Sequence, residues 1–257
     1  LGVIIDESKI SSQTTVADLK ALMTQADKAE DILLPLWQFS WWGRIVHKAA
    51  VRLILLPFHK YLIQIKFPQK NVPQIPPGSI VIFNHPGILD EICGLRLLYS
   101  QGRTDFITNA ASYLWLPKVT LIGKVNEIFA CSIPLYESGK KFLKVMQIDS
   151  DMMDKGYNLL FAPQGTTQRQ DKEDPFKTGI GYIVKELDRP VTIIRIKNYR
   201  EIWPAPKEDI KYAKLKDLLP KKRGTAILVV SQPLYKDWSK MSYLEITNLL
   251  EEKYQSL

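Results

Sequence analysis

The sequence predicts an α/β fold in which a mainly parallel sheet is flanked by helices. Short runs of β-branched apolar residues alternate along the chain with stretches of helical periodicity, a pattern typical of this class. Two of the runs stop abruptly in polar turns, at Asn84-His85 and at Pro163 to Thr166. Because the carboxyl ends of parallel strands meet at one edge of a sheet, we expect these two turns to lie side by side.

The individual elements follow from apolar periodicity and from turn residues. We expect strands over residues 61–67, 80–83, 104–109, 157–162, 189–196 and 225–230, and helices over 14–23, 43–56, 88–99, 139–155 and 243–254. Pro57 is expected to bend or end the second of these helices.

Residues 1–23 resemble the end of an acyl carrier protein domain. An acidic segment with valine and isoleucine precedes Thr14-Thr-Val-Ala-Asp-Leu19, a pattern with which the last helix of such a domain begins. A plain N-terminal helix is the alternative. The resemblance implies a piece of a larger fusion protein, with a carrier-domain tail at 1–25, a linker at 26–31 and a main domain at 32–257.

Residues 32–60 are expected to form an amphipathic two-helix motif that faces a membrane, ahead of an α/β core at 61–257. Between Ile32 and Leu89 the sequence has no Asp or Glu but six Lys and Arg. Tryptophans and basic residues at helical spacing predict a helix that lies on an anionic lipid surface. The residues expected to face it are Trp41, Trp42, Arg44, Lys48 and Arg52. A helix packed against the protein's own core is the alternative.

His85 is a candidate general base. It stands where a buried strand ends, and Asp90 falls five residues later in the first turn of the next helix. A carboxylate that reaches back to the imidazole fixes one tautomer and raises the basicity of the outward nitrogen, which suits removal of a proton from a hydroxyl. The alternative is a helix-capping histidine and a surface aspartate.

Four blocks in order resemble the PlsC-like glycerolipid acyltransferases, the family of lysophosphatidic acid acyltransferases. Asn84-His85 with Asp90 resembles its N-H-x4-D block, and Phe161-Ala-Pro-Gln-Gly-Thr166 resembles its F-x-P-E-G-T block. Pro175-Phe-Lys-Thr-Gly179 and Pro190-Val-Thr-Ile-Ile194 resemble the segments that follow. The resemblance runs from about residue 32 to about residue 235 and implies a glycerol-3-phosphate acyltransferase-like fold.

Two positions depart from the family pattern. Gln164 replaces the glutamate of P-E-G-T, and Glu137 stands where the family's P-x-x-R-like segment has its arginine. In the family both positions are thought to help hold the acceptor, commonly through a phosphate. A glutamate repels a phosphate, so the reaction type carries over better than the acceptor does. Lys140 can supply the missing positive charge, although a solvated helix start is the simpler interpretation.

The resemblance implies that the acceptor is held at the second polar turn. Backbone amides at Gly165 and Thr166 follow a strand and can cradle an anionic group. The hydroxyls of Thr166 and Thr167 add donors. The full set of expected acceptor-binding residues is Asn84, Lys140, Gln164, Gly165, Thr166 and Thr167.

The implied activity is O-acyl transfer from acyl-CoA or an acyl carrier protein, the latter as a partner in cis, to the hydroxyl of a lysophospholipid or related glycerolipid. No bound cofactor is expected. The resemblance makes His85 the catalytic base and Asp90 its orienting carboxylate, with the substrate supplying the nucleophile. A membrane lipid-binding module with an altered site and a thioester or lipid hydrolase using the same pair are the alternatives. The chain has no G-x-S-x-G nucleophile elbow, which disfavours the hydrolase.

The composition of the sequence limits the classes of binding partner that the protein can have. The net charge of +8 favours a polyanion, but no nucleic-acid recognition motif is present, so an anionic membrane surface is favoured. His47, His59 and His85 lack metal-ligand spacing, and we expect no metal site. Cys93 and Cys131 lie in apolar surroundings and are expected to be buried thiols. No uncharged apolar run reaches the roughly 18 residues of a membrane span. We expect a peripheral protein on the cytoplasmic face of the cell membrane.

Overall fold

The computed structural model describes residues 34, 36–115, 120–136, 139–168, 173–206 and 215–257. The expected carrier-domain tail at 1–25, the linker at 26–31 and Glu137 lie outside these residues. The predictions made for them therefore stay predictions.

The described residues form a seven-stranded sheet in the order β1-β7-β6-β2-β5-β3-β4. The strands are β1 (Ile63–Lys66), β2 (Ile80–Phe83), β3 (Phe106–Ala111), β4 (Ser132–Leu135), β5 (Asn158–Phe161), β6 (Val191–Lys197) and β7 (Gly224–Val230). Neighbouring strands pair in parallel, except that β6 and β7 are antiparallel. The predicted mainly parallel α/β fold is confirmed, with β4 as a strand that the sequence did not predict.

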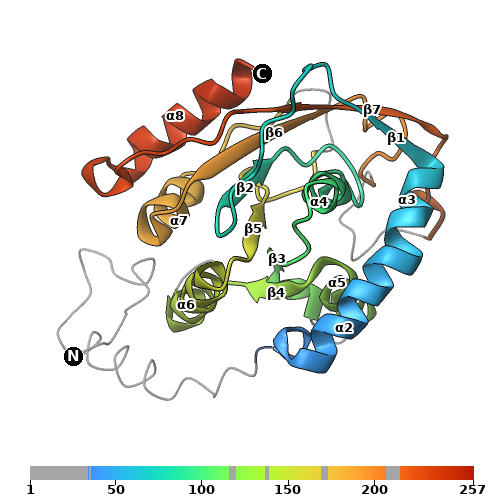
Figure 1. The fold of residues 1–257 in the computed structure, drawn as a ribbon, viewed down its shortest axis with the longest axis horizontal. Coiled ribbons are helices and arrows are strands. Elements are labelled where there is room, and N and C mark those ends of the chain that lie inside the picture. The colour runs from blue at the N-terminus through green and yellow to red at the C-terminus, as the bar shows by residue number, and fades with distance from the viewer. Residues whose placement is uncertain (1–33, 35, 116–119, 137–138, 169–172, 207–214) are drawn as a thin grey trace, which may run out of the picture.

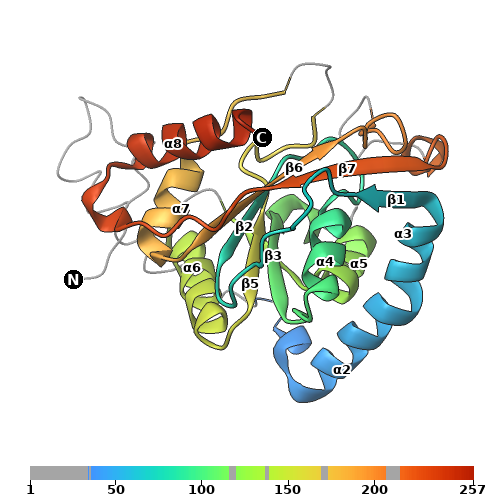
Figure 2. The same ribbon diagram turned by 45° about the horizontal axis from the view of Figure 1, so that its top comes forward.

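Helices cover both faces of this sheet (Figures 1 and 2). They are α2 (Trp41–Ala50), α3 (Leu56–Leu62), α4 (Glu91–Ser100), α5 (Thr120–Ala130), α6 (Gly139–Asp154), α7 (Gly179–Leu187) and α8 (Tyr243–Gln255). In both views α2 to α5 lie on one side and α6 to α8 on the other. Helices α5 and α7 were not expected from periodicity.

The central strand β2 shows why the sheet needs two helical layers. Val81 and Phe83 belong to a core cluster that includes residues of α3 and α4. Ile80 and Ile82 belong to a second cluster that includes residues of α6, α7 and α8. Successive side chains of a strand point to opposite faces, so an uninterrupted apolar run is buried on both sides.

The helix that precedes β1 differs from the expected two-helix motif. Described residues Trp41–Leu62 form one continuous helical segment, in which a π-helical turn (Val51–Leu55) joins α2 to α3. The Leu56 N–H bonds the Val51 carbonyl, five residues back. Pro57, which has no N–H to donate, follows this widened turn and is tolerated there. Of the two outcomes expected at Pro57, a bend or an end of the helix, the structure contradicts the end, because α3 continues through Pro57.

Candidate active site

Asn84 fastens the end of β2 to β6. Its side-chain Nδ2 donates to the Ile196 carbonyl at 3.0 Å, and its Oδ1 accepts from the Ile196 N–H at 2.7 Å. The side chain is buried, and both of its polar atoms are used. Asn84 thus positions the adjacent His85, while its expected contact with an acceptor stays a prediction.

His85 and Asp90 form the pair that the sequence predicted. The His85 Nδ1 lies 2.7 Å and 2.9 Å from the two carboxylate oxygens of Asp90. The Gly87 N–H donates to Asp90 Oδ2 at 2.8 Å, so the carboxylate is held from a second direction. Asp90 is fully buried, whereas 26% of the His85 side chain is exposed. This arrangement leaves Nε2 of His85 as the nitrogen available for proton transfer.

The surroundings of His85 make it a stronger base than an ordinary histidine. Burial lowers the pKa of His85, but the charge of Asp90, its hydrogen bond and the charge of Glu91 outweigh burial. The pKa therefore lies above 6.5. A higher pKa favours proton uptake from a hydroxyl, but it also means that the neutral base forms only at higher pH.

The loop between His85 and Asp90 is tightly constrained. Leu89 has a φ of 56°, a left-handed conformation that costs energy in a non-glycine residue. A Cβ on Gly87 would stand 1.9 Å from the Trp203 carbonyl oxygen, so only glycine fits. The Tyr199 hydroxyl donates to the Ile88 carbonyl at 2.6 Å. The segment after β6 therefore holds this loop in one shape, as a preorganised site requires.

The second polar turn meets the first, as predicted. The Gln168 N–H donates to the His85 carbonyl at 2.8 Å. Thr167 Oγ1 lies 3.2 Å from Nε2 of His85. Thr167 was expected to contact an acceptor, and in the structure its hydroxyl contacts the imidazole of His85.

The other residues of this turn have distinct environments. The Gln164 side chain is 1% exposed, and neither of its amide atoms has a hydrogen-bond partner in the described structure. Gly165 has a φ of 70°, and a Cβ there would stand 3.1 Å from Nζ of Lys177. Lys177 is a cation at the turn that the sequence analysis did not single out, although it lies in the third family block. Thr166 is exposed.

Lys140 lies in the first turn of α6. Its expected contact with the acceptor stays a prediction.

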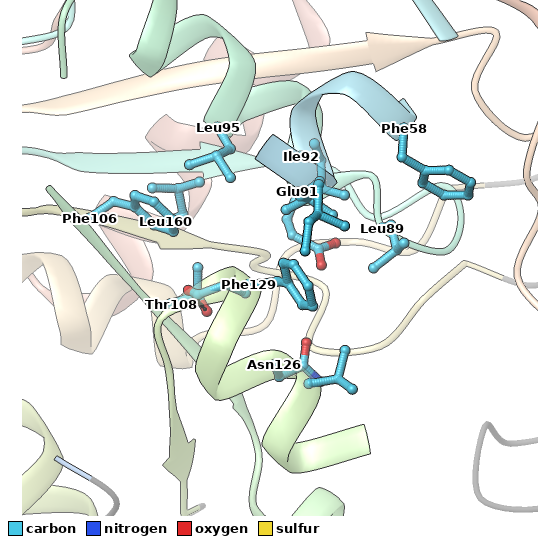
Figure 3. Close-up of a pocket in the computed structure, with 14 residues that line it drawn as sticks. Phe58, Leu89, Glu91, Ile92, Leu95, Phe106, Thr108, Asn126, Phe129 and Leu160 are labelled. Atoms are coloured by element: carbon cyan, nitrogen blue, oxygen red, sulfur yellow. Dashed lines mark hydrogen bonds between the residues drawn. The ribbon is translucent and has the colours of Figure 1, made fainter. Parts of the chain in front are cut away.

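An apolar pocket of ≈ 230 Å³ lies between α3, α4, α5 and the sheet (Figure 3). Its lining includes Leu55, Phe58, Ile92, Phe129 and Leu160. Glu91, the residue after Asp90, also lines it, and Figure 3 shows its carboxyl group directed among these apolar side chains. The pocket therefore reaches the residue that follows Asp90 in the chain.

Glu91 brings a third ionisable group to this place. Burial, followed by the charge of Asp90, raises the pKa of Glu91 to about 7. Donor atoms of His85, Asp90 and Glu91 lie within 4.8 Å of one another, which is close enough for a shared cation. However, both oxygens of Asp90 accept hydrogen bonds from His85, and one also from Gly87. The two oxygens of Asp90 are thus already engaged in orienting His85 and the Gly87 backbone.

The basic side chains of the helical segment before β1 have interaction partners within the protein. Arg44 and Lys48 pair with Asp105 at 3.1 Å and 2.9 Å. The Arg52 guanidinium lies 5.9 Å from the centre of the Tyr99 ring. Asp105, just before β3, and Tyr99 in α4 thus supply partners that helical periodicity cannot reveal. Arg44 and Arg52 are nevertheless exposed, so the expected place of these side chains on a membrane face stays a prediction.

The exposed face of the same segment is apolar. We call it the apolar stripe, and it consists of Trp41, Trp42, Ile45, Val46, Leu53, Ile54, Phe58 and Tyr61. Trp41 is 77% exposed and Leu53 is 76% exposed. Trp42, which was also expected to face a membrane, stacks on Trp37 at 5.4 Å between ring centres. None of the described helices combines the length and the apolar character that crossing a membrane demands.

Comparisons with known proteins agree with this geometry. The sequence model of the family described as Acyltransferase matches residues 64–197, a range that contains both polar turns. A curated relative, the chloroplastic 1-acyl-sn-glycerol-3-phosphate acyltransferase BAT2 of Brassica napus, is 22% identical over 213 residues. The match covers 80% of this chain and 54% of that protein, so the chain spans about half the length of this relative.

A solved structure shares the fold. The 1-acyl-sn-glycerophosphate (LPA) acyltransferase PlsC of Thermotoga maritima superposes with a TM-score of 0.50 at 14% sequence identity. The superposition covers 86% of this chain and 90% of that one.

Proposed function

The chain belongs to the Acyltransferase family, and we propose that it transfers a fatty acyl group from a thioester to the hydroxyl of a glycerolipid such as a lysophospholipid. The observation that carries the proposal is the His85–Asp90 pair, together with the apolar pocket that is lined by Leu89 and Glu91, the two residues on either side of Asp90 in the chain. Acyl-CoA and an acyl carrier protein are both suitable thioester donors.

The chemistry needs one base and one orienting carboxylate. Nε2 of His85 takes the proton of the attacking hydroxyl, and the oxygen bonds to the thioester carbonyl carbon. Asp90 stabilises the imidazolium that forms and keeps the ring oriented. The imidazolium then protonates the sulfur that leaves.

The apolar pocket is the proposed place of the acyl chain. Each CH2 group that moves from water into such a pocket contributes about 0.8 kcal/mol. Ile54, Phe58 and Val125 line the pocket and are at the same time exposed. Ile54 and Phe58 also belong to the apolar stripe, so the pocket opens beside that stripe.

The apolar stripe supports a lipid bilayer as partner. Exposed aromatic and aliphatic side chains along one helical face are typical of elements that rest in a membrane interface. With the pocket mouth beside the stripe, an acyl chain can enter from the lipid phase. We therefore place the protein peripherally on the cytoplasmic face of the cell membrane.

The acceptor is proposed to be a lysophospholipid because the named relatives are acyltransferases of 1-acyl-sn-glycerol-3-phosphate. Lys177 beside Gly165 supplies a positive charge at the second turn. The unpartnered amide of Gln164 can hydrogen-bond a hydroxyl or a phosphate oxygen.

A thiol-release assay tests this function. Purified protein is mixed with liposomes and an acyl-CoA, with and without lysophosphatidic acid. Sustained thiol release that depends on the lysolipid and is lost in His85→Ala is the expected result, with retention of the fold checked by circular dichroism. Sustained release of thiol together with free fatty acid, independent of the lysolipid, would identify a hydrolase instead.

A further inference from the structure

We propose that the loop of residues 218–223, which precedes β7, is a second membrane-contacting element that binds the headgroups of anionic phospholipids. We call it the basic loop, because it ends in Lys221-Lys-Arg223. The inference rests on the peripheral membrane binding proposed above and extends it. The apolar stripe supplies contacts with the acyl layer of a bilayer, and the basic loop supplies contacts with its negatively charged surface.

The basic loop is held beside the apolar stripe by the segment that follows β6. The Trp203 Nε1–H donates to the Leu218 carbonyl at 2.8 Å. The Lys221 N–H donates to the Ile202 carbonyl, also at 2.8 Å. The ring of Trp203 meets the ring of Phe58 edge-on, with 6.1 Å between the ring centres. Because Phe58 belongs to the apolar stripe, one tryptophan connects the two surfaces.

Arg223 makes a second contact with the stripe. Its guanidinium carbon lies 3.4 Å from the centre of the Tyr61 ring. Tyr61 is the last residue of the stripe and is 63% exposed. The parallel pairing of β1 with β7, which aligns Ile63 with Gly224, brings the two side chains together. A ring that carries a cation on its face can enter a lipid interface while the charge stays at the depth of the headgroups.

The cations of this surface have few partners within the protein. Lys60, Lys221, Lys222 and Arg223 are all exposed. Lys222 forms an ion pair with Glu201 at 3.2 Å, and both side chains of this pair are exposed. In the part of the chain that the structure describes, no carboxylate forms an ion pair with Lys60 or Lys221. These charges are therefore available to an external anion.

Exposed apolar groups accompany the cations and favour a bilayer over a small anion. Leu219, within the basic loop, is 56% exposed. The exposed carboxylates nearby are Glu201 and Asp217, so the four cations outnumber them and the surface is positive. A free phosphate can neutralise such cations, but it leaves Leu219 and Tyr61 in water. A bilayer with anionic headgroups accepts both kinds of side chain.

The basic loop and the apolar stripe together orient the apolar pocket. Phe58 lines the pocket and contacts Trp203, which holds the basic loop. A bilayer that touches the stripe and the loop at once therefore lies over the side of the pocket at Phe58. An acyl chain can enter from the lipid phase at that side, so anionic lipid should increase acyl transfer as well as binding.

Vesicle binding with and without anionic lipid tests the inference. The protein is co-sedimented with phosphatidylcholine vesicles and with vesicles that also contain phosphatidylglycerol. Tighter binding to the anionic vesicles is expected, and the gain should shrink at high salt. Lys221→Gln should lower the binding constant for these vesicles about fivefold, and Lys221→Gln with Arg223→Gln about 25-fold. Binding to phosphatidylcholine alone should stay unchanged.

A matched control makes the same change of charge elsewhere. Lys144→Gln with Lys253→Gln removes two exposed cations from α6 and α8, on the other side of the sheet (Figures 1 and 2). This variant should bind anionic vesicles as wild type does. Circular dichroism checks that every variant is folded. Transfer to lysophosphatidic acid in detergent micelles, which offer no bilayer, should be equal in the wild type and all variants.

The outcomes separate this surface from the proposed function. Equal binding of anionic vesicles by the wild type and the Lys221→Gln, Arg223→Gln double variant overturns the inference and leaves acyl transfer standing. Slower transfer by that variant in micelles, with unchanged vesicle binding, assigns the cations to the acyl donor and also overturns it. A wild type that binds anionic vesicles through these residues but transfers no acyl group supports the surface and contradicts the proposed function.

Discussion

In the proposed reaction His85 acts through Nε2, the ring nitrogen that Asp90 leaves free. The carboxylate occupies Nδ1 and raises the pKa of the ring, so that Nε2 is both available and basic. The N-H-x4-D block was sufficient to predict this pair, because five residues of chain bring the two side chains together locally. The contact of Thr167 with the same ring joins residues 82 positions apart, and it depends on how β5 packs beside β2. No local pattern could predict it.

Asp90→Asn tests the role of the carboxylate. The amide cannot stabilise the imidazolium and favours the wrong tautomer, so kcat/KM should fall by about 10⁴-fold. In the wild type the rate should rise with pH as His85 loses its proton, with a midpoint above 6.5. Without the charge of Asp90 that midpoint should move to lower pH, as a pH–rate profile will show. An unchanged midpoint in Asp90→Asn would contradict the assigned role.

Glu91→Gln removes a second group that titrates near pH 7. This variant should lower the midpoint of the pH–rate profile by less than Asp90→Asn does.

At the scale of elements, periodicity predicted helices and strands better than it predicted their surroundings. The segment Trp41–Leu62 was recognised as amphipathic, but its basic side chains turn to Asp105 and Tyr99 and leave the apolar stripe outside. Helix α7 was missed because Gly179 and Gly181 interrupt its pattern, and glycine is a poor helix former. The structure shows why a glycine is needed there.

Gly181 allows close packing of α7 on α8. A Cβ at this position would stand 1.9 Å from the Tyr243 carbonyl oxygen, whereas a Cβ on Gly179 in the same helix meets nothing within 4 Å. Gly181→Ala should therefore lower the free energy of unfolding by about 1–3 kcal/mol, the usual cost of overpacking. Gly179→Ala should be neutral or slightly stabilising. Thermal unfolding of the two variants measures the difference, and equal stabilities would contradict this account of the α7–α8 contact.

The apolar stripe makes its own prediction about lipid binding. Leu53→Asp places a charge on the stripe and should reduce co-sedimentation with liposomes by about tenfold, since a buried carboxylate is costly in the interface. Leu244→Asp, which changes a leucine on α8 that is 58% exposed, is the control and should bind as wild type. Equal lipid binding by both variants would show that the stripe is not the membrane-contacting face.

At the scale of the whole molecule, the sequence predicted the class of fold and the meeting of the two polar turns, because all strand ends of a parallel sheet share an edge. The predicted buried thiols of Cys93 and Cys131 are also confirmed. The strand order, the antiparallel β7 and the pocket were not predictable, since they depend on which distant segments pack together. The pocket in particular combines residues from five elements that are separated along the chain.

Identification of the lipid product tests the central claim most directly. The protein is incubated with liposomes, one acyl thioester and a panel of lysolipids with different headgroups, and the lipids are analysed by mass spectrometry. The account predicts that a lysolipid gains the mass of the donor's acyl group with wild-type protein and not with His85→Ala. Equal product formation by wild type and His85→Ala, or the appearance of free fatty acid alone, would contradict it.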